Sequence, residues 1–591
     1  MRSKWKQRSR GPYQLRDQAT DLLLYLRNIF LLIGLPVYLF SSDISWNYGI
    51  TTNLGRGEQQ GQDYDYSENY LSLSGQSGPW YLDLSLEYSS PPEYGYDFSG
   101  VQNLLLRYTS DSWVLEAGDI SAVFGNGLAL QLYEDQTIDF DNRIRGIRIQ
   151  SEFLPSNAIK FIAGMNDSYR FYSPSSDLRE PDGEASFRLI GLESSHVNGS
   201  GTWMVSPYLI GSQMVSDHSK FVLDTQSGSV NLDTSSQTQH AIQVGLGQTV
   251  SGSSWDVYLE FSSVWKAFDH PLIEQSVLQT GNGVTLRNEM IEYERQGQAL
   301  NFQLNWFPEW ATLMFDYRRY LSGPEINADK RDPLLLGQKA LPWQMGPTGV
   351  RQHDINLLAN VTHPVDYGDE LGWTVEMRKY FGHSWNLILN ASQVSRSRDN
   401  RDMSLDAGVF PSSDIRQHPW SEYFIELDYA GNRLSQRMLA ASTRSVLSGV
   451  NSAEVSHHLT LVPAYMSWII NPDLVVTGVV ELQKTRVTGI SYDDIELDGH
   501  EFSSYHLVGS MDLQGKYSLS VIWDANDDPL LNAGKHEMQN WISGELSVKP
   551  LDGLWLRASY GKEKGGVRCT GGVCRILNPF EGFRVSMEWR R

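Results

Sequence analysis

Apolar and polar residues alternate one for one in many segments of the chain. Residues 300–306 run Leu-Asn-Phe-Gln-Leu-Asn-Trp, residues 371–378 run Leu-Gly-Trp-Thr-Val-Glu-Met-Arg, and the last segment, 583–590, has the same pattern. A period of two places successive side chains on opposite faces of a β-strand. The alternation recurs over about ten residues at a time, which is the length that a tilted strand needs to cross a bilayer. The pattern therefore predicts membrane-spanning strands with one apolar face.

Tight connections separate many of these segments and are rich in Pro, Gly, Asn and Ser, as hairpin turns require. There are eleven of them: Gln76–Pro79, Ser110–Ser112, Leu154–Asn157, Asn198–Gly201, Ser251–Ser254, Phe307–Glu309, Phe381–His383, Ala430–Asn432, Asn471–Asp473, Leu513–Gly515 and Lys549–Gly553. The connections between them are mostly longer and polar, and we expect loops at Arg56–Asn69, Ser89–Gly100, Asn166–Glu184, Ser216–Ser236 and Arg396–Pro419.

Short connections on one side and long ones on the other are the layout of an outer-membrane β-barrel. Eleven inner hairpins and one strand at each end give about 24 antiparallel strands, with a range of roughly 20–26. An even number of strands places both termini in the periplasm. The fold predicted is therefore an all-β transmembrane barrel in the bacterial outer membrane.

Tryptophans gather beside the tight connections, where we expect the periplasmic aromatic girdle, because amphipathic rings favour the membrane–water interface. The girdle residues are Trp80, Trp113, Trp203, Trp255, Trp306, Trp310, Trp385 and Trp555.

Two long stretches, 119–142 and 322–370, do not fit the alternation of short and long connections. The second contains an apolar run, Ile355–Val361, that would break the parity of the barrel if it crossed the membrane. We therefore expect both stretches to fold into the lumen or over its mouth, since wide barrels are commonly plugged. The predicted plug residues are Arg351, Gln352, His353, Asp354 and Asn356.

The N-terminus has a different character, with six basic residues in positions 2–16 followed by an apolar run that ends at Phe40. We interpret residues 1–42 as a signal peptide or export segment and residues 43–591 as one barrel domain. An uncleaved anchor helix is the alternative. Elsewhere the chain is rich in Tyr (29), Trp (18) and Gly (51), which favours strands. The net charge of −22 argues against a nucleic-acid partner, since phosphate binding needs a basic face.

Candidate chemistry is sparse. Gly125-Asn126-Gly127 opens no helix that would bind a phosphate. His353-Asp354 with His363, and His457-His458, lack further metal ligands at a recognised spacing. Many Ser and several His are present, but no nucleophile elbow marks a hydrolase. We therefore expect no metal, no cofactor and no enzymatic activity.

Two features outside the strands have alternative interpretations. Cys569 and Cys574 are separated by four residues, two of them Gly, and export to an oxidising compartment favours a structural disulfide over a metal or redox pair. The Tyr-rich acidic runs Asp63–Tyr70 and Pro91–Asp97 suit sugar stacking or Ca²⁺ binding, although a solvated loop is the preferred interpretation.

Several islands of sequence resemble a family of predicted bacterial outer-membrane barrels that is known only as a domain of unknown function. The islands are Gly118–Ile120, Phe124–Leu128, Tyr133-Glu134, Asp141–Arg143, Arg145–Arg148, Arg351–Asp354, Leu357–Asn360, Cys569–Arg575 and Asn578–Phe583. Family members usually end on an aromatic residue, whereas this chain ends Trp589-Arg590-Arg591. The resemblance implies location and fold, and no reaction.

The function expected from these observations is a channel or receptor-like barrel for polar solutes with a partly plugged lumen. The alternatives are a structural or docking barrel for an envelope or secretion complex and, more weakly, a barrel hydrolase. The expected partners are outer-membrane lipid, the barrel assembly machinery and other envelope proteins, with no nucleic acid.

Overall fold

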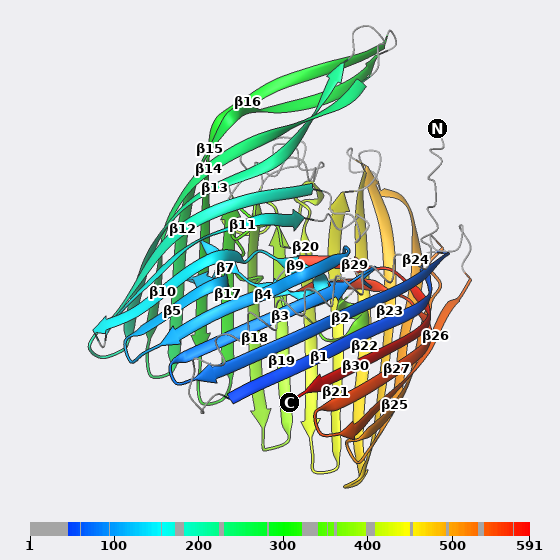
Figure 1. Ribbon diagram of the computed structural model, residues 1–591. Coiled ribbons are helices and arrows are strands. Elements are labelled where there is room, and N and C mark those ends of the chain that lie inside the picture. Colours follow the sequence, from blue (N-terminus) through cyan, green and yellow to red (C-terminus); the bar gives the residue numbers. More distant parts are fainter. Residues whose placement is uncertain are drawn as a thin grey trace, which may run out of the picture.

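The computed structural model describes residues 45–591 except 60, 94, 155, 172–182, 224–229, 281–282, 322–340, 352, 360–362, 364, 398–407, 449–452, 492–495, 530–536 and 571–572. Twenty-four strands form one antiparallel sheet that closes on itself, and Figure 1 shows the resulting barrel. Closure is made by β1 (Ser45–Gln59) and β30 (Phe580–Arg590), which pair from Gly49 opposite Arg590 to Gln59 opposite Phe580. The predicted fold class is confirmed.

The other wall strands follow chain order. They are β2 (Gln62–Ser77), β3 (Trp80–Ser89), β4 (Phe98–Thr109), β5 (Trp113–Ile120), β10 (Ile144–Leu154), β11 (Asn157–Phe171), β12 (Gly183–Val197), β13 (Trp203–Leu223), β14 (Val230–Ser251), β15 (Trp255–Thr280), β16 (Gly283–Trp306), β17 (Thr312–Leu321), β18 (Glu370–Phe381), β19 (Trp385–Ser395), β20 (Trp420–Ala430), β21 (Leu434–Ser448), β22 (Ala453–Asn471), β23 (Leu474–Ser491), β24 (Glu496–Leu513), β25 (Tyr517–Asn526), β26 (Gln539–Leu551) and β27 (Leu554–Glu563).

All eleven predicted tight connections join neighbouring strands on one side of the barrel. The first described strand begins on that side and the last one ends there, since the backbones of Tyr48 and Arg591 exchange hydrogen bonds of 2.9 Å. No helix among the described residues is both long and apolar enough to cross a membrane.

Two of the predicted long loops are wrong. Residues 56–69 belong mostly to β1 and β2, and residues 216–236 extend β13 and β14. The longest strands are β15 and β16, with 26 and 24 residues, and they project beyond the rim of the barrel (Figure 1). The polar sequences of residues 56–69 and 216–236 predicted loops. A strand outside the bilayer keeps its backbone hydrogen bonds but needs no apolar face, so its sequence lacks the alternating pattern.

The wall exposes apolar side chains outward and buries polar ones inward. On β15, the side chains of Leu259 and Phe261 are 40% and 43% exposed, whereas those of Glu260 and Ser262 are 0% and 1% exposed. In a soluble protein the apolar face of a strand is buried. Here the apolar face is exposed and the polar face is buried, which is typical of a barrel whose outer face contacts lipid.

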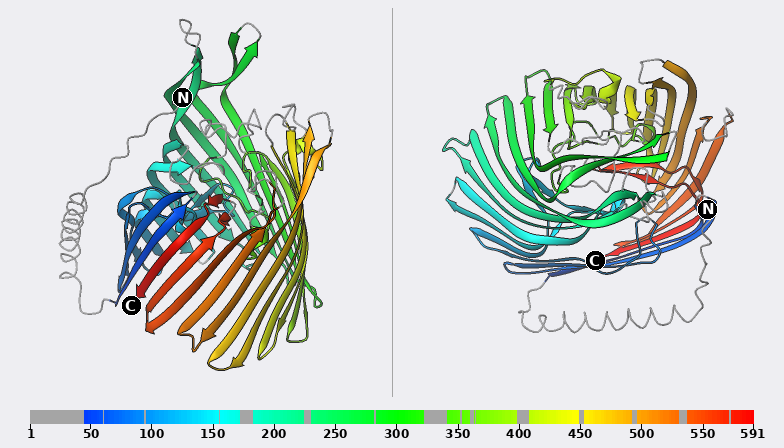
Figure 2. Two further views of the ribbon diagram at one scale, coloured as in Figure 1. Left: turned by 90° about the vertical axis from the view of Figure 1, so that its right-hand side faces the viewer. Right: turned by 90° about the horizontal axis from the view of Figure 1, so that it is seen from above.

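Two chain segments leave the wall and fill part of the lumen, as the fold prediction expected. The first lumen segment, residues 121–143, contains β6 (Ala122–Phe124), β7 (Leu130–Leu132), β8 (Glu134–Asp135), the 3₁₀ turn η1 (Gln136–Ile138) and β9 (Phe140–Asp141). The second, described at 341–369 with gaps at 352, 360–362 and 364, contains α2 (Asn356–Ala359), and we call it the strut. Seen from above, short elements lie inside the ring of the wall (Figure 2).

Three further elements belong to the long connections. The 3₁₀ turn η3 (Ile415–Gln417) precedes β20, and β28 (Gly566–Thr570) pairs with β29 (Val573–Leu577) in a hairpin between β27 and β30. The predicted boundaries of the lumen segments shift slightly, because Asp119 and Ile120 belong to β5 and Glu370 begins β18. The predicted export segment, residues 1–42, lies outside the described residues.

We expect the detergent-extracted protein to migrate faster on a gel when it is loaded unheated than after boiling. Every strand of the closed ladder has neighbours on both sides, so detergent alone does not open it. Identical mobility before and after boiling would contradict a stable closed barrel.

Substituting Arg for Leu104 on the lipid face should destabilise the barrel by about 2–4 kcal/mol if this residue lies near the bilayer midplane. Leu104 is 43% exposed on the outer face, whereas Ser85 of the adjacent strand lines a lumen cavity. Arg at Ser85 should therefore cost much less. Denaturant titration in lipid vesicles measures both variants, and equal costs would mean that the assigned facing is wrong.

Candidate functional site

The first lumen segment is fixed to the wall by two carboxylates. Glu193 of β12 accepts a hydrogen bond of 2.9 Å from the Gly125 N–H, and Glu260 of β15 accepts one of 2.7 Å from the Asn126 N–H. Gly125 has a φ of +57°, and a Cβ there would lie 2.2 Å from the Glu260 carboxylate. The glycine-rich motif is therefore a tight turn that lets the backbone reach these carboxylates.

The same segment buries an apolar surface against the inward face of the wall. Phe124, Leu130 and Leu132 are at most 1% exposed and pack in one cluster with wall residues of β11 to β15. Gly191 of β12 makes room for this contact, because a Cβ there would lie 2.8 Å from the Phe124 ring. The lumen wall is thus polar except where a segment docks on it.

The strut begins on the first lumen segment. The Gln131 N–H donates to the Trp343 carbonyl at 2.8 Å, and the Met345 N–H donates to the Gly127 carbonyl at 3.1 Å. The Asn142 side-chain amide donates to the Pro342 carbonyl at 3.0 Å. These bonds join the two lumen segments into one body.

The strut then reaches the opposite part of the wall, where four predicted plug residues meet side chains of β18 to β24. Arg351 lies 3.6 Å from Glu426 and its guanidinium faces the Phe424 ring. His353 bonds Glu422 at 2.8 Å in a pair whose two side chains are 2% and 3% exposed. Gln352 lies outside the described residues.

Asp354 and the start of α2 complete this attachment. The Asp354 carboxylate accepts two hydrogen bonds of 2.8 Å from the Arg437 guanidinium. The Glu481 carboxylate accepts from the backbone N–H groups of Asn356 (3.1 Å) and Leu357 (2.8 Å), which are unsatisfied donors of the short helix.

An apolar contact lies beneath these polar ones. Ile355, Leu357 and Leu358 are at most 2% exposed. They pack in one cluster with Ile388, Phe424, Leu439, Ala441 and Leu461 of the wall. The described part of the apolar run, residues 355–359, therefore contains a short helix seated on an apolar patch, and is not a membrane-spanning strand.

The structure does not bring the histidines of this region together. His363 bonds Glu370 at 2.9 Å, and Glu370 also binds the fully buried Arg318 at 2.6 Å, so His363 and His353 have separate carboxylate partners. His457 and His458 are successive residues of β22 and point to opposite faces. Within the described residues, no three His, Cys, Asp or Glu side chains form a group suited to a metal ion.

Beside the lumen segments a polar cavity of about 1150 Å³ stays open against the inward faces of β1 to β4. It is lined from Asn47 and Arg591 at the tight-turn side to Glu93 and Tyr96 in the connection between β3 and β4. Nine acidic and five basic side chains line it, an acidic excess of four. We call it the acidic cavity.

Three carboxylates of β2 and β3 contribute to the acidic excess of the cavity. Glu68 accepts a hydrogen bond from Asn53, Asp83 from Asn103 and Glu87 from Ser89. In the described part of the chain, no Lys or Arg lies within ion-pair distance of Glu68, Asp83 or Glu87. Sequence reasoning missed these three, although their polar positions in the alternating pattern are a usable signal.

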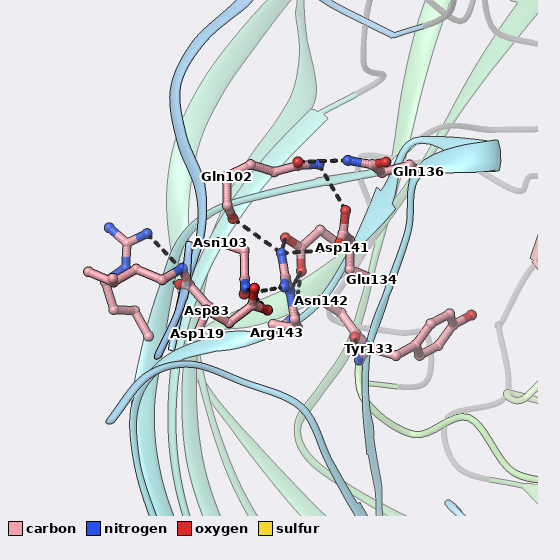
Figure 3. A network of polar contacts seen from close by, with 12 residues as sticks. Asp83, Gln102, Asn103, Asp119, Tyr133, Glu134, Gln136, Asp141, Asn142 and Arg143 are labelled. Atoms are coloured by element: carbon pink, nitrogen blue, oxygen red, sulfur yellow. Dashed lines mark hydrogen bonds and ion pairs between the residues drawn. The ribbon is translucent and has the colours of Figure 1, made fainter. Parts of the chain in front are cut away.

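A second cavity of about 640 Å³ adjoins the first along β3 to β5. A network of polar side chains stands where the two meet, with the Arg143 guanidinium among Glu134, Asp141 and Asn103 (Figure 3). Its members come from wall strands and from the first lumen segment, so this boundary exists only because that segment lies in the lumen.

The remaining predicted residues lie as follows. All eight girdle tryptophans have exposed side chains, and Trp255 and Trp306 are register partners on adjacent strands. Cys569 and Cys574 are opposite each other in the β28–β29 hairpin, and the disulfide stays a prediction. In the connection at Pro91–Asp97 the Glu93 N–H donates to Glu68 at 2.8 Å, and Glu93 and Tyr96 line the acidic cavity. The solvated loop stays a prediction.

Comparisons with known proteins give one family and a set of solved structures of similar fold. The model of a family of unknown function, DUF6029, matches residues 40–429. No curated protein is significantly similar to the chain.

Among solved structures, the copper transporter OprC is 10% identical with a TM-score of 0.44, over 93% of this chain and 81% of that chain. The siderophore receptor PirA from Pseudomonas aeruginosa is 8% identical with a TM-score of 0.43, over 92% and 80%. The ferric-catecholate import receptor Fiu from E. coli K12 is 10% identical with a TM-score of 0.39, over 93% and 82%. These scores are too low for the cargo of those proteins to bear on this chain.

The attachment of the strut should weaken in acid. The hydrogen bonds from Arg437 hold the pKa of the Asp354 carboxyl below its ordinary value. The stabilisation from Asp354 is therefore complete above the ordinary Asp pKa of about 4 and is lost as the pH falls through the lower pKa of the folded protein. Amide hydrogen exchange at residues 355–359 should show protection that falls in this window.

Asp354→Asn is the matched control, since other carboxylates titrate equally in both proteins. The variant should be less protected than the parent at pH 7, and the difference should vanish in acid. A difference that persists unchanged at pH 2 would exclude this ion pair as the cause.

Proposed function

The chain belongs to the family of unknown function DUF6029. We propose that it is an outer-membrane channel or receptor-like barrel for polar solutes, with a lumen partly filled by its own segments. The proposal assigns it no reaction and no cofactor. The acidic cavity is the observation that carries it.

The acidic cavity suits the passage or capture of a polar solute because it runs along the wall and has polar groups along its length. Its lining begins at the C-terminal Arg591 and extends to the β3–β4 connection at Glu93. Glu68 and Glu87 have no Lys or Arg within ion-pair distance among the described residues, and such carboxylates would raise the local concentration of positively charged solutes. Rings and rows of carboxylates are a usual source of cation preference in pores.

The strut is the part of the lumen filling that can be removed. The barrel closes through β1 and β30, far from it, and every wall strand has two neighbours without it. Between Arg351 and Ala359 its hold on the wall consists of a few ion pairs, the hydrogen bonds to Glu481 and one apolar patch. These features support a plug that is attached to this part of the wall through Arg351, His353, Asp354 and Asn356, which we call its latch.

The proposal also places the molecule in its envelope. The tight turns and both barrel ends would face the periplasm, and the exposed tryptophans beside the turns would form the girdle at that interface. Lipid would cover the outer face, and the barrel assembly machinery would insert the chain.

A docking or structural barrel is the second candidate, and one observation favours it. The β15–β16 hairpin continues far beyond the rim (Figure 1), and its register extends to Thr280 opposite Gly283. A projecting ribbon offers backbone edges to a partner protein. Conductance separates the candidates, because a scaffold with a permanently filled lumen would not pass ions.

In planar bilayers we expect the native barrel to pass ions in discrete steps, and deletion of Gly346–Pro364 to enlarge those steps. The deletion removes the latch and α2 but keeps Trp343, which is fully buried against the first lumen segment. Unheated gel mobility shows whether the variant folds. A folded variant with no conductance, together with a silent native protein, would contradict the channel proposal.

A further inference from the structure

We propose that Arg143 is the specificity-determining residue of the lumen: its guanidinium closes the boundary between the two cavities and neutralises the carboxylates that stand there. This inference rests on the proposed function, since it concerns which solutes use the route. When Arg143 is replaced by an uncharged residue, we expect the boundary to favour small cations.

The first observation is the position of Arg143 on the wall that the two cavities share. Eight residues line both cavities: Asp83, Ser85, Gln102, Asp119, Glu134, Gln136, Thr137 and Arg143. Arg143 is the only basic residue among these eight. A solute that moves from one cavity to the other therefore meets a single positive charge, and it meets three carboxylates.

The second observation is how tightly the guanidinium is held. It donates to the Asp141 carboxylate at 3.0 and 2.8 Å, to the Asn103 side chain at 2.9 Å and to the Gln102 carbonyl at 3.2 Å, and it lies 3.4 Å from Glu134. The Arg143 side chain is only 8% exposed. A planar group with this many partners occupies one fixed position, so the boundary is closed by a rigid side chain and not by a mobile one.

The third observation is a second row of hydrogen bonds that joins the wall to the first lumen segment beside Arg143. The Gln102 amide donates to Glu134 at 2.8 Å, and the Gln136 amide donates to Gln102 at 2.6 Å (Figure 3). Gln102 belongs to the wall strand β4, whereas Glu134 and Gln136 belong to the first lumen segment. The boundary is thus a seam between wall and segment, with Arg143 at its centre.

Neutralising Arg143 has two consequences in the same place. In the described chain Glu134 and Asp141 have no other cation within ion-pair distance, so each would face the cavities as an uncompensated carboxylate. A Gln side chain is also shorter than Arg and cannot span the seam. Both changes favour cations, the first by charge and the second by opening the passage.

The ionisation of Glu134 should make the effect of replacing Arg143 depend on pH. A merely structural role of Arg143 would not produce this dependence. It lies in β8 of the first lumen segment, outside the spanning strands. Burial raises the pKa of the Glu134 carboxyl, and the adjacent Arg143 opposes that rise. Without Arg143 the pKa of Glu134 should be higher still, so the added cation preference should be strong in alkaline solution and fade as the pH falls.

The experiment measures the cation-over-anion permeability ratio of the full chain in planar bilayers under a KCl gradient. We expect Arg143→Gln to raise the ratio several-fold and to enlarge the conductance, with the gain greater at pH 8.5 than at pH 5. Arg143→Lys keeps the charge and should stay close to the parent ratio. Arg56→Gln removes an exposed Arg that lines neither cavity and should leave the ratio unchanged.

Glu134→Gln keeps the inference testable if Arg143→Gln does not fold, as judged by unheated gel mobility. This variant retains an oxygen for Gln102 but removes the charge, so the ratio should fall below that of the parent. Folded, conducting variants with the parent ratio at both pH values would overturn the role of Arg143 alone. If neither the parent nor the Gly346–Pro364 deletion conducts, the proposed function fails instead.

Discussion

The constraint on which the rest of this structure depends is that a backbone in lipid has no water to bond, so every strand needs a neighbour on both sides. The chain meets it by pairing β1 with β30 from Gly49 to Gln59. A closed ring of 24 strands encloses a lumen far wider than its own side chains can fill. The lumen segments, their carboxylate anchors and the acidic cavity are all consequences of that width.

The inward face of the wall differs between the parts that the lumen segments cover and the parts that stay open. Where a segment docks, the inward face combines charged anchors with apolar positions, such as Phe187 beneath the first lumen segment and Leu439 and Leu461 beneath the strut. Where no segment docks, as along β2 and β3, inward positions are Glu, Asp and Ser. The alternating pattern is the same in both parts of the wall, and the inward residues decide whether a segment docks or the lumen stays open. The proposed passage of solutes belongs to the open part.

Much of the fold could be predicted from the sequence because its signals are local. The tight turn at Gln76–Pro79 and the alternation at 300–306 need no information beyond a few neighbouring residues. The strand extension at 56–69 was missed because its sequence, rich in Gly, Gln and acidic residues, shows no continuous apolar face. The Arg143 network was missed because its members come from β4, β8, β9 and the connection that follows β9. Local patterns do not say which strands surround a lumen segment. The strut was located, but its partners Glu422 and Glu481 were not, for the same reason.

The central claim is that the lumen is open along β2 and closed beneath the strut, and thiol accessibility tests it most directly. Ser72→Cys faces the acidic cavity, and Ala441→Cys lies in the apolar cluster under Ile355. In proteoliposomes, with the parent chain as background, a cationic water-soluble thiol reagent should label Ser72→Cys quickly, and faster than an anionic one does. Ala441→Cys should stay protected until Gly346–Pro364 is deleted. Equal labelling of both sites in the intact chain, or a protected Ser72→Cys, would contradict the account.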